Sequence, residues 1–218
     1  MSNSQYNLKV ILLSAGKSER FKAIKLITKV KHESHSIPLI QYVLQKITAS
    51  LTVLKINKHN LYIATGCYHE QISEVIGQQG TVIYCSNAHL GLGHTIGQSI
   101  SHVISNDNMT NRASHIMITL ADQIALTTHD YIRLIEQSLS APEKLICAKA
   151  DIDIMPPAIF PRHYFTQLMN LTGDKGAKVF LQRNTDNLQE IIMPNAAIDI
   201  DVQQDLINWH KKTNVNSS

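Results

Sequence analysis

Residues 10–25 hold the side chains of this sequence that are best suited to chemistry on phosphate groups. Four apolar residues at 10–13 lead into Ser14, Ala15 and Gly16, a pattern that predicts a buried strand ending in a tight loop. Such a loop points several N–H groups into one concavity that suits anionic oxygens, because glycine permits backbone angles closed to other residues. Cations follow within a few residues, namely Lys17, Arg20, Lys22 and Lys25. The combination indicates a triphosphate site.

Residues 15–18, Ala-Gly-Lys-Ser, also look like the end of the P-loop motif G-x-x-x-x-G-K-[ST]. That motif requires its first glycine five residues before Gly16, where this sequence has Ile11 inside the predicted strand. The sequence therefore argues against a P-loop ATPase.

A carboxylate in the middle of the chain is the second feature with chemical potential. Asp122 directly follows the apolar run 116–121, so we expect it at the carboxyl end of a buried strand, where parallel sheets bind ligands. A carboxylate in that place can hold Mg²⁺ against phosphate oxygens. The alternative is that Asp122 caps the amino end of a helix.

The elements that must position these residues alternate along the chain. Period-2 and continuous apolar runs predict strands at 10–13, 61–65, 81–84, 116–120 and 145–149. Helical spacing predicts helices at 39–47, 70–76, 96–104 (with Thr95 as N-cap), 130–139, 176–181 and 205–209. This alternation is typical of βαβ units in a three-layer α/β/α, Rossmann-like fold with a mostly parallel sheet. We expect a single domain over 1–218 with a polar tail at 211–218.

Composition excludes several other classes of protein. Hydrophobic residues make up 44% and charged residues 17% of the chain, which is ordinary for a globular protein. A net charge of +3 is too small to indicate nucleic acid, and no apolar run is long enough to cross a membrane. Three widely spaced cysteines and eleven histidines form no disulfide framework and no zinc-ligand spacing. Cytoplasm is the expected location.

The loop pattern L-x-A-G-x-S-x-R-F-x-x-x-K-L at 13–26 resembles the signature of the molybdenum cofactor cytidylyl- and guanylyltransferases. The resemblance implies that the glycine loop wraps a nucleotide and that Arg20 and Lys25 contact its triphosphate. Two further stretches match: 87–95 resembles the family's N-x-x-x-G-M-G-S-S, and 120–123 its L-x-A/G-D-Q. The resemblance thereby implies catalytic roles for Lys25, Arg20 and Asp122. The implied nucleotide-binding residues are Leu13, Ser14, Ala15, Gly16, Lys17, Arg20, Lys25, Gly66 (at a predicted strand end), Asn87 and Gly93.

The C-terminal half carries the remaining matches. Residues 198–206 resemble the family's D-I-D-T-P-E-D-L, which implies that Asp201, or else Asp199, completes an Mg²⁺ site with Asp122. The segment 171–178 resembles L-x-G-D-x-G-A-R/K on the acceptor side. Its implied acceptor-binding residues are Gly173, Asp174, Lys175 and Gly176. The resemblance also implies at least one antiparallel strand in this half of the sheet.

Three departures from the family pattern concern loops. Lys22 stands where glycine is usual, Ile124 replaces a proline, and residues 155–157 read Met-Pro-Pro where Gly-His-Pro is common. The last of these concerns the acceptor rather than the class of reaction.

The expected function is that of an Mg²⁺-dependent CTP:molybdopterin cytidylyltransferase that releases pyrophosphate. CTP is favoured because the loop reads Leu13-Ser14-Ala15-Gly16, closer to the L-A-A-G of the cytidylyltransferases than to L-A-G-G. The alternatives are transfer from GTP, transfer to a sugar or alcohol phosphate, and an inactive nucleotide- or cofactor-binding accessory protein. A molybdoenzyme client or its chaperone is a further expected partner.

Overall fold

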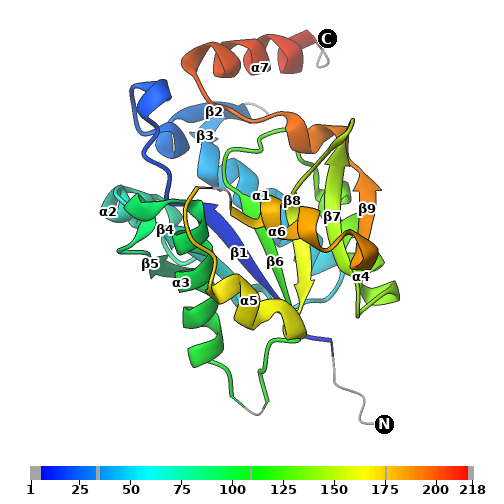
Figure 1. Ribbon diagram of the computed structural model, residues 1–218. Coiled ribbons are helices and arrows are strands. Elements are labelled where there is room, and N and C mark those ends of the chain that lie inside the picture. The colour runs from blue at the N-terminus through cyan, green and yellow to red at the C-terminus, as the bar shows by residue number, and fades with distance from the viewer. Residues whose placement is uncertain (1–5, 33–34, 109, 175, 216–218) are drawn as a thin grey trace.

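The computed structural model describes residues 6–32, 35–108, 110–174 and 176–215; residues 213–215 are described by their backbone alone. Within this part of the chain one seven-stranded sheet runs in the order β5-β4-β1-β6-β8-β7-β9, and a separate hairpin joins β2 to β3 (Figure 1). The strands are β1 (Leu8–Ser14), β2 (Lys29–His32), β3 (His35–Pro38), β4 (Leu61–Thr65), β5 (Thr81–Tyr84), β6 (His115–Leu120), β7 (Leu145–Ala150), β8 (Asp153–Pro161) and β9 (Leu188–Ile192).

Strand β8 is the one described strand of the large sheet that runs against its neighbours, pairing antiparallel with both β6 and β7. The pairs on either side, β1 with β4 and β6, β4 with β5, and β7 with β9, are parallel. The predicted antiparallel strand from the C-terminal half is therefore confirmed, as is the mostly parallel sheet.

Helices cover both faces of the sheet because β1 is buried on both sides. Val10 and Leu12 pack into one apolar cluster with α1 and α4, whereas Ile11 and Leu13 pack into a second cluster with α3, α5 and α6. Successive side chains of a strand point to opposite faces, so a continuous apolar run requires a helical layer on each. The helices are α1 (Leu39–Val53), α2 (His69–Ile76), α3 (Leu92–Ser105), α4 (Thr128–Ser140), α5 (Phe165–Met169), α6 (Gly176–Arg183) and α7 (Gln203–Val215).

The three-layer α/β/α fold predicted from the sequence is confirmed by this arrangement (Figure 1). Helix α7 lies outside the three layers, beside β2. None of the helices in the described ranges is both long and apolar enough to cross a bilayer.

Two predicted helix boundaries are wrong. Thr95 does not cap α3, which begins three residues earlier at Leu92 after Gly91; Thr95 lies inside the first turn, where its Oγ1 donates to the Gly91 carbonyl. The expected polar tail from residue 211 is instead the second half of α7, which continues to Val215. Lysine favours helices, so a polar composition alone does not end one.

Asp122 caps no helix, contrary to the alternative reading. Helix α4 begins six residues later, where Thr127 and Asp130 form a reciprocal capping box. The carboxylate of Asp122 is therefore not used to cap a helix.

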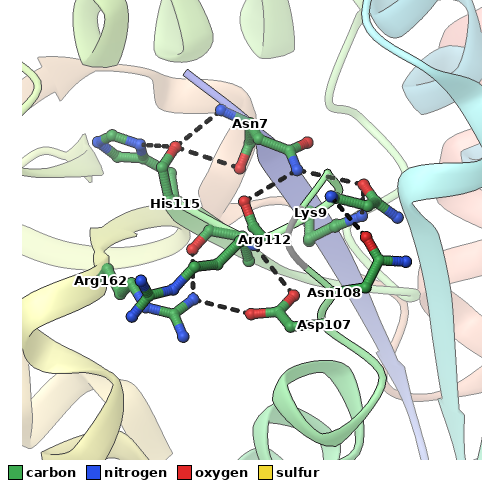
Figure 2. A network of polar contacts seen from close by, with 10 residues as sticks. Asn7, Lys9, Asp107, Asn108, Arg112, His115 and Arg162 are labelled. Carbon is green, nitrogen blue, oxygen red and sulfur yellow. Dashed lines mark hydrogen bonds and ion pairs between the residues drawn. The ribbon is translucent and has the colours of Figure 1, made fainter. Parts of the chain in front are cut away.

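The amino end of β1 is closed by a buried polar network (Figure 2). Lys9 is only 1% exposed, and its Nζ donates to Asn60 Oδ1 at 2.8 Å and to Asn111 Oδ1 at 2.6 Å. Burial lowers the pKa of Lys9, while the nearby Asp107 carboxylate opposes that shift. Asp107 in turn accepts from Arg162 Nη1 at 2.8 Å. The network ties the loop before β6 to β1, so this edge of the sheet is structural.

Replacing Asn60 by alanine should destabilise the protein by about 1–3 kcal/mol, since it leaves a buried ammonium short of an acceptor. Lys9→Met should cost less, because it removes the charge together with its need for a partner. Urea unfolding of both variants measures the difference. A larger loss for Lys9→Met than for Asn60→Ala would contradict this account.

Candidate nucleotide and metal site

The loop after β1 lies tightly against the end of β4. The Ser14 hydroxyl donates to the Ala64 carbonyl at 2.7 Å, and a Cβ on Gly66 would lie 2.7 Å from the Ala15 oxygen. A side chain at position 66 would therefore push the loop away, which is why glycine is required there. Lys22 adopts φ 59°, a left-handed conformation that favours glycine. Lys22 thus adopts a backbone conformation that glycine adopts with less strain.

A cavity of about 650 Å³ opens between this loop, the start of α3 and the end of β6. Nine residues singled out from the sequence line it: Leu13, Ala15, Gly16, Lys17, Arg20, Lys25, Asp122, Asp174 and Asp201. The structure therefore brings together residues from four separate segments of the chain at the carboxyl edge of the sheet.

Other predicted residues lie behind the cavity wall. Ser14 is buried in the sheet, Gly66 supports Ala15, and Asn87 precedes the turn that carries Ala88 and His89 into the lining. Gly93 packs against the backbone of Thr172, and its N–H donates to the Gly173 carbonyl at 2.8 Å. These residues are placed to shape the cavity rather than to line it.

The predicted acceptor segment meets the amino end of α3. A Cβ on Gly91 would lie 2.5 Å from Asp174 Oδ1, and one on Gly176 would lie 2.6 Å from the Leu92 side chain. Gly173 forms the contact with Gly93 described above, and Lys175 lies outside the described residues. The segment therefore helps to close the cavity lined by the cation-rich loop and α3, which we name the nucleotide cavity after its expected ligand.

The sequence analysis gave no individual binding role to several residues of the α3 wall, the side of the cavity formed by Ala88, His89, Gly91, Leu92 and Thr95. The N-x-x-x-G-x-G pattern at 87–93 is the signal that locates this wall. The amino end of α3 borders the cavity, where the helix dipole favours an anion.

Three carboxylates meet at one end of the cavity. Asp122, Asp199 and Asp201 each offer an oxygen within 4.8 Å of the others. Asp122 Oδ1 is buried, and no hydrogen-bond partner for it exists among the described residues. Partial burial, together with the charges of Asp122 and Asp201, raises the pKa of Asp199. Converging carboxylate oxygens, one of them buried and unpaired, fit a hard divalent cation such as Mg²⁺ or Mn²⁺.

Two basic side chains of the loop already contact these carboxylates. Lys25 Nζ lies 2.8 Å from Asp122 Oδ2 and 3.6 Å from Asp201 Oδ1, and the lysine is buried. Arg20 Nη2 lies 2.9 Å from Asp201 Oδ2, but the arginine side chain is 75% exposed. An exposed ion pair is weak. Arg20 can therefore exchange its carboxylate for a phosphate, whereas Lys25 is held in place.

The backbone of Asp122 links the two halves of the acidic cluster. Its carbonyl accepts from the N–H of Ile200 at 3.1 Å, and Ile200 lies between Asp199 and Asp201. This bond sets the segment 199–201 beside the end of β6.

Gln123 reinforces that arrangement, although the sequence analysis assigned it no role. It is 3% exposed, and its Nε2 donates to the carbonyls of Pro156 and Ala196, each at 2.7 Å. Its neighbour Ile124 accepts from Lys46 Nζ, also at 2.7 Å. One amide thus joins the loop of Asp122 to β8 and to the turn that precedes Asp199.

Replacing Gln123 by methionine keeps the side-chain volume and removes these hydrogen bonds, so the carboxylates should lose their spacing. We expect about tenfold weaker Mn²⁺ binding, as is usual when a residue that supports metal ligands is lost. Electron paramagnetic resonance of free Mn²⁺ measures the affinity. Gln182→Met, on the exposed side of α6, is the matched control. Unchanged Mn²⁺ affinity in a folded Gln123→Met protein would count against the assignment.

Comparisons with solved structures agree with this fold. Rv0371C from Mycobacterium tuberculosis, in complex with manganese, aligns with a TM-score of 0.69 and 15% identity over 95% of this chain and 100% of that chain. CMP:2-keto-3-deoxy-manno-octonic acid synthetase complexed with CTP aligns with a TM-score of 0.71 and 10% identity over 96% and 99%. Molybdopterin-guanine dinucleotide biosynthesis protein A from Archaeoglobus fulgidus aligns with a TM-score of 0.66 and 15% identity over 94% and 98%.

At such low identities these alignments show a shared fold only. The family is shown by a match between the sequence and a family model. The family model described as the MobA-like NTP transferase domain matches residues 10–188, which include the cation-rich loop, the α3 wall and Asp122. The chain therefore belongs to the MobA-like NTP transferase family.

Proposed function

We propose that this nucleotidyltransferase transfers a cytidylyl group from CTP to the phosphate of a molybdopterin-like acceptor and releases pyrophosphate. The observation that carries the proposal is the cavity in which Lys25 and Arg20 face the carboxylates of Asp122 and Asp201. Positioned cations beside a metal-binding cluster are the main requirement for transfer between two phosphate groups, since both reactants are anions.

In the proposed reaction an oxygen of the acceptor phosphate forms a bond to the α-phosphorus of CTP. The bond from that phosphorus to the oxygen bridging the β-phosphate breaks, and pyrophosphate leaves with the electron pair. The backbone of the loop at Ala15 and Gly16 would bind the triphosphate, and Arg20 would leave Asp201 to pair with its outer phosphates. Lys25 would stabilise the charge that develops at the α-phosphate.

A divalent cation, Mg²⁺ in our proposal, would be held by Asp122 and Asp201, with Asp199 as a third candidate ligand. When bound, it would neutralise phosphate oxygens and orient the triphosphate. The unpaired Asp122 Oδ1 and the raised pKa of Asp199 support a cation here, and a related structure was solved with manganese.

Asp122→Asn should keep the fold and lose most metal-dependent activity, because an amide binds a divalent cation far more weakly than a carboxylate does. Lys25→Ala should lose a transition-state interaction of about 2–4 kcal/mol, comparable to a lost oxyanion donor. Pyrophosphate release measures both. Lys22→Gly, on the same loop but outside the cavity lining, is the control that should remain active. Activity like that of the unmodified protein in both site variants would refute the assignment.

The choice of CTP depends on the small residues around position 15. Ala15 lines the cavity, and its methyl carbon would lie 3.1 Å from a Cβ placed on Gly66. That methyl group occupies room which a purine would need, so a pyrimidine should fit better by about 1–3 kcal/mol. Incubation with molybdopterin, Mg²⁺ and either CTP or GTP should yield mainly the cytidine dinucleotide. Preferential use of GTP would reverse the base assignment, and transfer only to a sugar phosphate would replace the acceptor.

A further inference from the structure

A second hollow adjoins the nucleotide cavity, and we call it the α7 hollow. It measures about 500 Å³ and lies between residues 197–201 and helix α7. Asp201 lines both spaces, whereas Asp122 lines only the nucleotide cavity and Asp199 lines only the α7 hollow. The acidic cluster therefore stands where the two hollows meet.

The lining of the α7 hollow includes one aromatic residue and one basic residue. Trp209 packs against the core cluster of the α1 face and also borders the hollow. Lys212 is the one basic residue among those that line it, and Asn208 adds an amide. Asp205 is less available to contact a ligand, because its Oδ2 already accepts from the N–H groups of Asp201 and Val202, each at 2.8 Å.

Transfer of a nucleotidyl group requires the acceptor oxygen to approach the α-phosphorus at the acidic cluster. The triphosphate reaches that cluster through the nucleotide cavity, which is lined by the cation-rich loop and α3. An acceptor that approached by another route would not displace the triphosphate. Among the described residues, the α7 hollow offers such a route, since it shares Asp201 with the nucleotide cavity.

We propose that the α7 hollow is the acceptor subsite and that it takes a phosphate monoester joined to a planar heterocycle. The ring would lie against the Trp209 indole, because aromatic surfaces prefer stacked contacts. Lys212 would draw the phosphate toward the junction with Asp201. This inference rests on the proposed nucleotidyl transfer and adds to it the place at which the acceptor binds.

The chain contains a single tryptophan, so tryptophan fluorescence reports on the surroundings of Trp209. Protein loaded with Mg²⁺ and a non-hydrolysable CTP analogue should lose Trp209 emission on titration with molybdopterin. Inorganic phosphate and glucose 1-phosphate, which lack a planar ring, should quench weakly or not at all. Equal quenching by all three compounds would overturn the proposed planar-ring specificity.

Two lysine variants of α7 separate an effect within the hollow from a general effect of removing a positive charge from this helix. Lys212→Gln should weaken the molybdopterin titration about tenfold, the usual effect of losing a charge-assisted hydrogen bond. It should raise KM for the acceptor and leave KM for CTP unchanged. Lys211→Gln, on the same helix but outside the lining, is the matched control.

The competing location for the acceptor is the 173–176 segment, tested by Asp174→Asn. If Asp174→Asn raises the acceptor KM and Lys212→Gln does not, the α7 hollow is the wrong site. Dinucleotide formation without any change in Trp209 emission would likewise overturn this inference while leaving the proposed function intact. Quenching that is weakened by Lys212→Gln, with no dinucleotide formed, would support the subsite and contradict the proposed transfer.

Discussion

Mutual repulsion among three carboxylates is the constraint on which the site depends. Asp122, Asp199 and Asp201 converge at the carboxyl edge of the sheet, and their charges must be compensated there. Without a metal ion, Lys25 and Arg20 supply the compensation. A bound cation and a triphosphate would redistribute these pairs, since the cation would satisfy the carboxylates and the phosphates would receive the basic groups. The same residues thus serve a ligand-free and a ligand-bound arrangement.

Holding like charges together requires a rigid support, which the fold provides with main-chain and amide hydrogen bonds. The bond from Ile200 to the Asp122 carbonyl and the clamp made by Gln123 connect β6, β8 and the segment before α7. Lys46 binds the same loop from α1. Burial lowers the pKa of Lys46 to about 8, while Asp130 opposes the shift. The edge that carries the acidic cluster is therefore held by α1, by β8 and by the segment before α7.

The two ends of β1 have opposite physical characters. At the amino end, Lys9 and its amide partners form a buried, hydrogen-bonded network with little room for a ligand. At the carboxyl end, the strand leads into a loop whose backbone and cations face a cavity. This difference follows from the parallel sheet, because strand ends that are continued by helices leave free N–H groups at the carboxyl edge.

The sequence by itself determined the alternating strands and helices, the cation-rich loop and Asp122 at a strand end. These features are local, since apolar periodicity and the residue that ends a strand depend on neighbours in the chain. The resemblance at 198–206 implied that Asp201 or Asp199 joins Asp122, but only the tertiary structure decided that both reach it, from 77 and 79 positions away (199 − 122 and 201 − 122). It also decided that Gln123 is a clamp and that α7, extended beyond its predicted end, borders a second hollow with Trp209. Such distances depend on strand order and on the packing of helices against the sheet, and no spacing along the chain encodes them.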